Sequence, residues 1–194
     1  MADKPHYQIL VIGGGAGGLN VAARLLRQEH ISDLAIIEPS NTHYYQSAWT
    51  LVGGGIIKRE VSAKPMADQI PAGATWIKDA VTELDPGNNS LKTRDGKTLS
   101  YDYLIVAPGL QINWNQISGL PYFMGKNGVC SNYDYETVNS TWEAIRDFQG
   151  GTALFTFPAT PIKCPGAAQK IMYLAEEQFR AQGVRDKSKV IICA

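Results

Sequence analysis

The sequence has little charge and few cysteines. Charged residues make up 19% of the 194 residues, and 18 basic side chains balance 18 acidic ones, so the formal net charge is zero. A neutral chain lacks the basic surface that nucleic-acid binding requires, and we expect no nucleic-acid partner. Three cysteines are a small and odd number, which argues against a fold held together by disulfides.

The sequence also lacks long apolar runs and a signal peptide. No segment approaches the ~18 uninterrupted apolar residues of a membrane-spanning helix. The start of the chain, Met1–Pro5, is too short and too polar for a signal peptide. The hydrophobic content of 44%, together with the low charge, suits a folded core rather than a disordered chain.

Glycine is the residue in informative excess, with 19 copies, many of them clustered. The cluster Gly13–Gly18 follows an apolar segment, Tyr7–Ile12, that predicts a strand. It precedes a segment with helical apolar spacing, Leu19–Gln28, and a second apolar strand is expected at Leu34–Ile37. This order predicts a right-handed βαβ unit within a parallel sheet.

The glycine cluster fits the dinucleotide-binding pattern G-x-G-x-x-G at Gly13, Gly15 and Gly18. In this pattern the first glycine allows a tight turn, the second lets the backbone approach a pyrophosphate, and the third lets the helix pack on the sheet. Glu38 ends the second strand, where a carboxylate can accept hydrogen bonds from ribose hydroxyls. Its negative charge disfavours a 2′-phosphate, so FAD or NAD is expected rather than NADP.

The middle of the chain predicts an antiparallel insertion. The segment Leu91–Tyr101 has the pattern of a hairpin that turns at Asp95-Gly96, and Tyr103–Ala107 is expected to be a buried strand. The segment Gln111–Asn132 resembles a connector, and Glu136–Phe148 is expected to be helical.

A second strand–helix–strand pattern closes the chain, at Thr152–Phe157, Gly166–Gln182 and Lys189–Ala194. We expect the last strand to be buried, with Cys193 in the core. Because the sequence stops within this strand, we expect the chain to be the N-terminal part of a longer protein.

The predicted fold class is therefore α/β: a Rossmann-like parallel sheet with an inserted antiparallel β-meander, plus an incomplete second βαβ domain. The predicted domains are residues 1–112 for FAD binding, a connector with a helix at 113–148, and a truncated second Rossmann-like domain at 149–194.

The strand that ends in Ala107-Pro108-Gly109, preceded by a hairpin, resembles the FAD domain of flavoproteins with two dinucleotide-binding domains. The resemblance implies that this turn passes close to the cofactor and that Val81 flanks the adenine. Pro108 departs from the family pattern, which more often has threonine at this position. The family's late Gly-Asp motif is missing, which agrees with truncation.

The cysteines narrow the choice of flavoenzyme. There is no C-x-x-C, and the region His43–Ala48, where glutathione reductase-type enzymes carry C-x4-C, has no cysteine. The turn at residues 158–166 has prolines and Lys163 where a second glycine fingerprint would bind a nicotinamide. It holds Cys164 just before a helix, where Lys163 and the helix dipole are expected to favour a thiolate. The alternative is an inert loop cysteine.

Three segments together resemble the sulfide:quinone oxidoreductases, in the branch that includes the mitochondrial enzyme. They are the glycine fingerprint, Glu38–Gly53 (EPSNTHYYQSAWTLVG) and Pro161–Glu176 (PIKCPGAAQKIMYLAE). The resemblance implies an FAD-dependent oxidation of sulfide to sulfane sulfur with electron transfer to quinone. It makes Cys164 one of a redox-active cysteine pair whose partner lies in the missing C-terminal half. Cys130 is a candidate sulfur relay or an incidental residue.

The resemblance also implies the remaining site and its setting. The partners would be sulfide, a sulfur acceptor, quinone and a membrane surface reached through the missing half, with a homo-oligomer as an option. The location would be peripheral, at a prokaryotic or mitochondrial inner membrane. The predicted cofactor-binding residues are Gly13, Gly15, Ala16, Gly17, Gly18, Glu38, Pro39, Gln46, Val81, Ala107, Pro108 and Gly109; no metal is expected.

Two other functions remain open from the sequence. One is a relative of the type II NADH:quinone dehydrogenases, although Cys164 and the absent second fingerprint speak against it. The other is a non-catalytic flavin-binding module, which the short length favours. Flavin absorbance of the purified chain would support one of the two quinone oxidoreductases, and a colourless chain that also fails to bind added FAD would favour a module without turnover.

Overall fold

The computed structural model describes residues 5–28, 31–160, 162–164 and 166–193. Its chain forms two compact units, one from residues 1–44 and 63–110 and the other from residues 45–62 and 111–194. Residues 45–62, which the sequence assigns to the first predicted domain, thus belong to the second compact unit. Compact units do not test domain boundaries, and the division at 112/113 and 148/149 stays a prediction.

The first unit is built on a six-stranded sheet with the strand order β5-β2-β1-β8-β7-β6. Strands β5, β2, β1 and β8 run parallel, and β8, β7 and β6 form an antiparallel meander. The predicted fold class is confirmed. The strands are β1 (His6–Ile12), β2 (Leu34–Ile37), β5 (Ala74–Ile77), β6 (Val81–Asp85), β7 (Ser90–Thr93) and β8 (Thr98–Val106).

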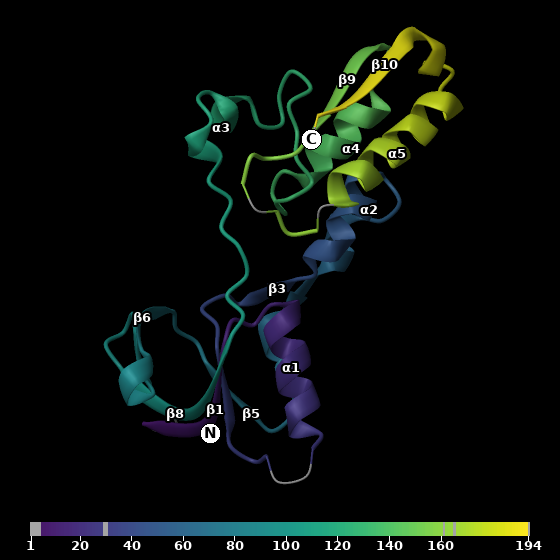
Figure 1. The fold of residues 1–194 in the computed structure, drawn as a ribbon. Coiled ribbons are helices and arrows are strands. Elements are labelled where there is room, and N and C mark those ends of the chain that lie inside the picture. The colour runs from purple at the N-terminus through teal and green to yellow at the C-terminus, as the bar shows by residue number, and fades with distance from the viewer. Residues whose placement is uncertain (1–4, 29–30, 161, 165, 194) are drawn as a thin grey trace. The chain divides into compact units, whose positions relative to one another are not determined.

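Strand β1 contributes side chains to the cores on both faces of this sheet, because successive side chains of a strand point to opposite sides. Ile9 and Val11 pack in a cluster with helix α1 (Ala16–Leu26), which lies alongside the sheet in Figure 1. Leu10 and Ile12 pack in the other cluster, with residues of the meander. All four side chains are buried, so the sheet has a core on each face.

The meander turns where the sequence predicts it. Gly96 has φ +82°, a left-handed conformation that glycine adopts readily, and the Thr93 N–H donates to the Lys97 carbonyl at 2.9 Å. The neighbouring Asp79 is buried and accepts hydrogen bonds from the Ala80 and Asp95 backbone N–H groups. Burial raises the pKa of this carboxyl, but these bonds and one with Thr93 outweigh burial and lower the pKa overall.

The segment between β2 and β5 holds two short strands of the first unit, β3 (Thr42–Tyr44) and β4 (Ala63–Pro65), which pair antiparallel. Between them the chain enters the second unit and forms helix α2 (Trp49–Gly53) and a short 3₁₀ segment at Arg59–Ser62.

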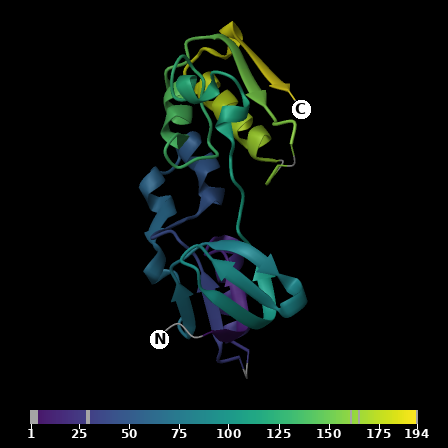
Figure 2. The ribbon, with the colours of Figure 1, turned by 90° about the vertical axis from the view of Figure 1, so that its left-hand side faces the viewer.

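The second unit contains the second strand–helix–strand pattern that the sequence predicts. Its parallel strands, β9 (Gly151–Thr156) and β10 (Ser188–Cys193), lie side by side in Figures 1 and 2. Helix α5 (Gly166–Ala181) connects them and ends before Gly183, which has φ +70°. The unit also includes α3 (Leu120–Phe123) and α4 (Val138–Arg146), the latter at the predicted place.

The core of the second unit lies between helices α4 and α5 and one face of the β9–β10 pair. Ile145 from α4 packs with Ile171 and Phe179 from α5, and Phe155 of β9 lies against this cluster. The Phe148 and Phe179 rings stack with centroids 4.4 Å apart. Apolar spacing along α5 thus explains why this segment forms a helix that packs on two strands.

Two strands predicted to be buried are exposed in part. Tyr103 and Val106 of β8 are 67% and 57% exposed, and both lie beyond Ser100, where the pairing of β7 with β8 ends within the described residues. Cys193 of β10 is exposed rather than in the core. The β9–β10 pair is covered by helices on one face, whereas Leu154 on the other face is 60% exposed.

Candidate functional site

The glycine turn of the first unit is packed tightly at its two ends. Gly13 has φ +100°, and a Cβ atom there would lie 2.1 Å from the Ala107 carbonyl oxygen. A Cβ atom at Gly18 would lie 1.9 Å from the Gly13 carbonyl oxygen and 3.2 Å from the Val11 side chain on β1. Because no side chain fits at either position, the turn after β1 can approach both β8 and the start of α1 only with glycine.

The middle of the same turn is open. No atom lies within 4 Å of a Cβ built at Gly15, and Gly15, Ala16 and Gly17 are all exposed. Gly15 is the N-cap of α1 and no side chain caps it, so the N–H groups that begin the helix are available to an anion. We refer to the exposed backbone of Gly15, Ala16 and Gly17 as the cradle. It fits the predicted pyrophosphate site, and these residues could hold the diphosphate of FAD.

Glu38 is placed beside this cradle, at the end of β2. One of its carboxylate oxygens accepts the Gly14 N–H at 2.8 Å, and the other accepts the Ser40 N–H at 2.8 Å. Each carboxylate oxygen has a second acceptor position, so the predicted bond to a ribose hydroxyl remains compatible with this geometry. In the structure Glu38 ties the glycine turn to the chain that follows β2.

The other predicted cofactor residues of the first unit lie in different surroundings. The Ala107 N–H donates to the Ile12 carbonyl at 2.8 Å, which brings the Ala107–Gly109 turn next to the glycine turn. Pro108 and Gly109 are exposed, and Pro39 next to Glu38 is exposed as well. Val81 is half-buried against the core of the sheet, and its predicted place beside an adenine stays a prediction.

Sequence reasoning missed two side chains that support the cradle. His43 is buried, and its Nδ1 atom lies 3.0 Å from the Gly14 carbonyl oxygen. The Trp76 indole N–H donates to the Glu38 carbonyl at 2.8 Å. Neither contact has a signal in the local sequence, because His43 follows Gly14 by 29 residues and Trp76 follows Glu38 by 38.

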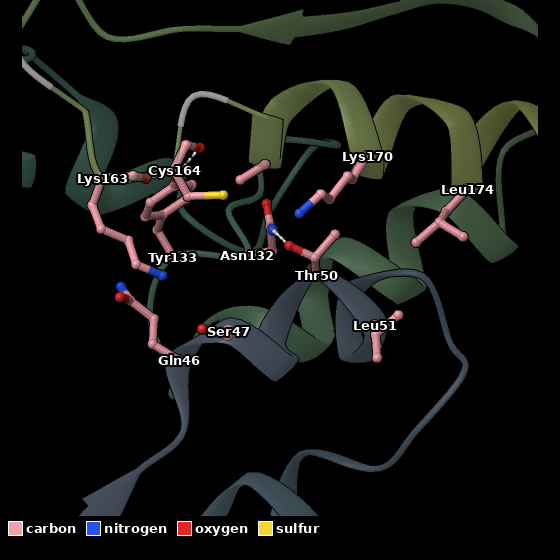
Figure 3. Close-up of a pocket in the computed structure, with 11 residues that line it drawn as sticks. Gln46, Ser47, Thr50, Leu51, Asn132, Tyr133, Lys163, Cys164, Lys170 and Leu174 are labelled. Atoms are coloured by element: carbon pink, nitrogen blue, oxygen red, sulfur yellow. Dashed lines mark hydrogen bonds between the residues drawn. The ribbon is translucent and has the colours of Figure 1, made fainter. Parts of the chain in front are cut away.

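The second unit contains a pocket of about 440 Å³ that includes Cys164. Figure 3 shows the Cys164 sulfur pointing into it, with the Lys170 amine directed toward the same space and the Lys163 amine beside Gln46. Gln46, predicted to contact the flavin, therefore lies in the cysteine's pocket. The lining residues are Gln46, Ser47, Thr50, Leu51, Asn132, Tyr133, Lys163, Cys164, Ala167, Lys170 and Leu174.

Cys164 has an unusual backbone conformation for a residue with a side chain, with φ +61°. Its carbonyl oxygen accepts the Ala167 N–H at 2.9 Å, at the beginning of α5. The Tyr133 hydroxyl donates to the Lys163 carbonyl at 2.7 Å and lies 3.3 Å from the Cys164 carbonyl. Burial raises the pKa of the Tyr133 phenol, and negative charge on Cys164 adds to the rise.

Cys130 is half-buried and is not among the residues that line this pocket. Burial raises the pKa of its thiol, and Thr141 opposes that rise in part. A raised pKa leaves less thiolate at neutral pH, which disfavours a nucleophilic role. A catalytic role for Cys130 stays a prediction.

The described parts of the chain contain neither a candidate metal cluster nor a candidate membrane-spanning helix. In those parts no group of three or more His, Cys, Asp or Glu side chains could hold a metal ion. No helix among the described residues has the length and apolar character to cross a membrane.

An open glycine cradle on a parallel sheet with an antiparallel meander defines a dinucleotide-binding fold. Residues 7–144 match the family model described as "Pyridine nucleotide-disulphide oxidoreductase", and the chain belongs to this family. The predicted class of oxidoreductase is thereby confirmed.

Within this class, close relatives of the chain are sulfide:quinone oxidoreductases. The mitochondrial sulfide:quinone oxidoreductase of Mus musculus is 48% identical over 188 residues, which cover 97% of this chain and 42% of the mouse protein. The Dictyostelium discoideum counterpart is 48% identical over 96% of this chain and 42% of its own length. The predicted resemblance is confirmed: the chain is a homologue of these enzymes and spans about two fifths of their length.

A solved structure agrees on the fold. The sulfide:quinone oxidoreductase of Aquifex aeolicus superposes with a TM-score of 0.70 and 21% identity, over 97% of this chain and 43% of that one. At this level of identity the likeness shows the fold alone.

Proposed function

We propose that this chain forms the dinucleotide cradle and one redox cysteine of an FAD-dependent enzyme that oxidises sulfide to sulfane sulfur and reduces quinone. The observation that carries the proposal is the position of Cys164, whose sulfur points into a pocket with Lys163 and Lys170. The relatives at 48% identity are sulfide:quinone oxidoreductases, which supports sulfide and quinone as substrates.

The residues of the first unit fit the cofactor. Gly15, Ala16 and Gly17 would face its diphosphate with the open start of α1, and Glu38 would accept a hydrogen bond from its ribose. When bound, FAD supplies two-electron transfer between the sulfur chemistry and quinone. The protein binds and orients the substrates and stabilises the negative charge that forms on sulfur.

Cys164 would act as the leaving group of the first step. Hydrosulfide attacks a disulfide between Cys164 and a second cysteine outside this chain. The new sulfur–sulfur bond forms at the second cysteine, which becomes a persulfide, and Cys164 leaves with the electron pair as a thiolate. Lys163 and Lys170 line the same pocket and would stabilise that negative charge.

The relatives also support a proposal for the reaction partners of the whole protein. A sulfur acceptor has to remove the persulfide sulfur, and a quinone is available in a membrane. We therefore place the enzyme at a membrane surface, as a peripheral protein.

The test uses the full protein that contains this chain, loaded with FAD. Cys164→Ser is expected to lower sulfide-dependent quinone reduction by at least about a hundredfold, because serine can form no disulfide for hydrosulfide to attack. Cys193→Ser is the matched control, because Cys193 is exposed and lies outside the pocket, and it should retain activity. Near-normal activity of Cys164→Ser would contradict the proposal, and NADH-dependent quinone reduction in its place would favour the dehydrogenase alternative.

A further inference from the structure

Tyr133 makes the side-chain contacts to the backbone of the cysteine turn. Its hydroxyl donates to the Lys163 carbonyl at 2.7 Å, and the Cys164 carbonyl lies 3.3 Å away. The two partners are separated from Tyr133 by 30 and 31 residues, so the bond joins two distant parts of the second unit. Figure 3 shows the Tyr133 ring directly below this turn.

The turn needs such support. Residues with a side chain rarely adopt the left-handed conformation that Cys164 has at φ +61°. The Ala167 N–H bond to the Cys164 carbonyl fixes the helix side of the turn. The Tyr133 hydroxyl fixes the other side, where Lys163 precedes the cysteine.

The loop that carries Tyr133 is itself held in place. The Tyr133 N–H donates to the Ser131 hydroxyl at 3.2 Å, and the Thr137 hydroxyl donates to the Ser131 carbonyl at 3.2 Å. Beside Tyr133, the Asn132 amide donates to the Thr50 hydroxyl of α2 at 3.2 Å, as Figure 3 shows.

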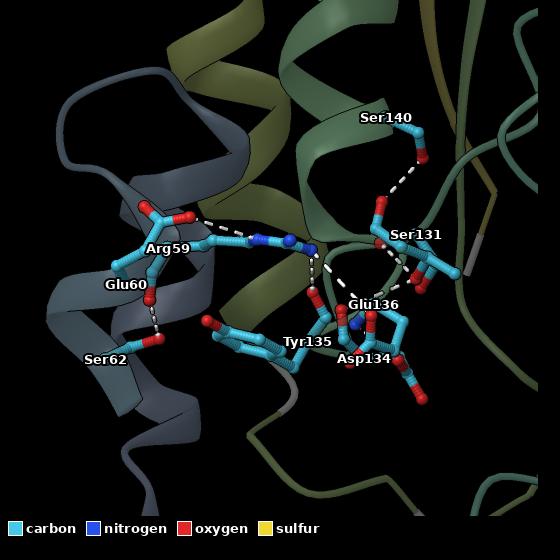
Figure 4. A network of polar contacts seen from close by, with 9 residues as sticks. Arg59, Glu60, Ser62, Ser131, Asp134, Tyr135, Glu136 and Ser140 are labelled. Atoms are coloured by element: carbon cyan, nitrogen blue, oxygen red, sulfur yellow. Dashed lines mark hydrogen bonds and ion pairs between the residues drawn. The ribbon is translucent and has the colours of Figure 1, made fainter. Parts of the chain in front are cut away.

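Arg59 holds the same loop from its other end. Its guanidinium lies 4.9 Å from the centroid of the Tyr135 ring and donates to the Tyr135 carbonyl at 3.4 Å. Figure 4 shows Arg59 reaching from its 3₁₀ segment across to this loop, near Glu136, with an ion pair at 3.9 Å. Tyr133 is thus mounted on a loop with two anchors, at Thr50 and at Arg59.

We propose that Tyr133 is a positioning residue for the redox cysteine: its hydroxyl holds the Lys163-Cys164 backbone so that the Cys164 sulfur points into the pocket that Lys163 and Lys170 line. The inference rests on the proposed function, because it assigns Tyr133 a part in that chemistry. Tyr133 contacts backbone carbonyls of the turn and acts through Cys164.

The test is a labelling experiment on the full chain that requires no turnover. The three cysteines are alkylated with iodoacetate, which is anionic, and with iodoacetamide, which is neutral, and each site is quantified by mass spectrometry. Because the Lys163 and Lys170 side chains line the same pocket as Cys164, its sulfur should prefer the anionic reagent. At each cysteine the rate with iodoacetate is divided by the rate with iodoacetamide, and the result is divided by the same ratio at the exposed Cys193. We expect this normalised ratio to be about three to five at Cys164.

Tyr133→Phe removes only the hydroxyl and should bring this normalised ratio at Cys164 down to about one. A non-specific loosening of the structure around Cys164 would raise its rates with both reagents equally and leave the ratio unchanged. Tyr173→Phe is the matched control, because it removes a hydroxyl from an exposed tyrosine of α5, and it should keep the ratio of the unaltered chain. A folded Tyr133→Phe variant with an unaltered ratio would overturn the proposal.

A second measurement on the unaltered sequence covers the case in which Tyr133→Phe does not fold. Nuclear magnetic resonance titration of ring-labelled tyrosine follows the Tyr133 phenol before and after Cys164 is capped with iodoacetamide. Because negative charge on Cys164 raises the pKa of Tyr133, capping should lower that pKa. No change would place the hydroxyl away from the cysteine and refute the inference, whereas the proposed sulfide oxidation stands or falls on the separate Cys164→Ser assay.

Discussion

The two strand–turn–helix units of this chain place opposite kinds of chemistry at the same point of the same pattern. After β1 the turn at Gly13–Gly18 is without functional side chains and exposes backbone at Gly15. After β9 the turn ends in Lys163 and Cys164, and side chains line a pocket there. One turn thus suits a phosphate that must approach the backbone, and the other suits a reaction at sulfur.

The two turns also differ in how their backbone conformation is supported. Gly13 adopts φ +100° where only glycine fits, so the residue type itself permits the turn. Cys164 adopts φ +61° with a side chain present, and hydrogen bonds from Ala167 and Tyr133 surround it. The first turn therefore has the residue type that its backbone conformation requires, whereas the second has a cysteine in a backbone conformation that is unfavourable for a residue with a side chain.

The largest effect is expected from Gly13→Ala. The new Cβ would lie 2.1 Å from the Ala107 carbonyl oxygen in a left-handed backbone, and we expect a loss of at least about 3 kcal/mol in the free energy of unfolding of the first unit. Urea unfolding of the full chain measures this loss. Gly96→Ala is the control, because Gly96 also has positive φ but no neighbour within 4 Å, and it should cost only about 1 kcal/mol. Equal losses would show that no clash exists at Gly13.

A smaller effect concerns the buried carboxylate of the first unit. Asp79→Asn removes a charged acceptor of backbone N–H bonds and should lower the free energy of unfolding by about 2 kcal/mol at pH 7. Because the pKa of Asp79 is lowered in the folded state, its stabilisation is present above the ordinary pKa and is lost as the pH falls through the folded value. Urea unfolding from pH 7 to pH 2 should therefore show the two proteins converging in acid.

The second unit offers the contrast for that pH series. Glu176 also has a lowered pKa, from hydrogen bonds with Arg180 and Arg185, but its side chain is partly exposed and Arg180 is exposed, so these ion pairs stabilise little. Glu176→Gln should leave the acid profile of the first unit unchanged. A constant difference between Asp79→Asn and the unaltered chain at all pH values would contradict the assigned ionisation.

Gly15→Ala should separate cofactor binding from folding. Gly15 has φ −74°, which alanine tolerates, and no atom lies within 4 Å of the new Cβ, so stability should change by less than about 0.5 kcal/mol. FAD affinity should fall by about tenfold or more, since the methyl group would occupy the space in which we propose that the diphosphate binds. Isothermal titration with FAD measures the affinity, and an unchanged value would remove the diphosphate from this turn.

The smallest effect has the opposite sign. Cys164→Gly should raise the free energy of unfolding of the second unit by about 1 kcal/mol, because glycine adopts φ +61° without strain. Cys164→Ala keeps the strain, removes the thiol and should be close to neutral. Urea unfolding compares the three proteins; a Cys164→Gly protein less stable than Cys164→Ala would show that the cysteine turn is not strained.

Local patterns in the sequence predicted much of the fold. The strand, glycine turn and helix from β1 to α1 follow from apolar spacing and from glycines that only one kind of turn requires. The hairpin at Asp95-Gly96 and the end of α5 before Gly183 follow from residues that adopt positive φ. These features depend on neighbours in sequence, which is why composition and spacing could predict them.

The features that the sequence did not reveal depend on distant contacts. The exposed Tyr103 lies in the part of β8 that does not pair with β7 among the described residues, and an apolar run carries no information about the length of the neighbouring strand. The contacts of His43 with Gly14 and of Tyr133 with the cysteine turn each bridge about thirty residues. The sequence predicts a reactive Cys164, and that role stays a prediction; it gave no sign of the tyrosine whose hydroxyl bonds to the backbone of the cysteine turn.

The register of β1 has a consequence for the glycine turn. Strand β1 pairs with β8 at a constant offset from His6 opposite Ser100 to Ile12 opposite Val106, and the next residues in this series are Gly13 and Ala107. The register of this strand therefore places Gly13 directly against the Ala107 carbonyl, which leaves no room for a side chain at position 13. A one-residue insertion anywhere in β1 would exchange the two hydrophobic faces and shift the cradle together, so sequences that keep this fold should tolerate length changes in the meander before they tolerate any in the seven residues of β1.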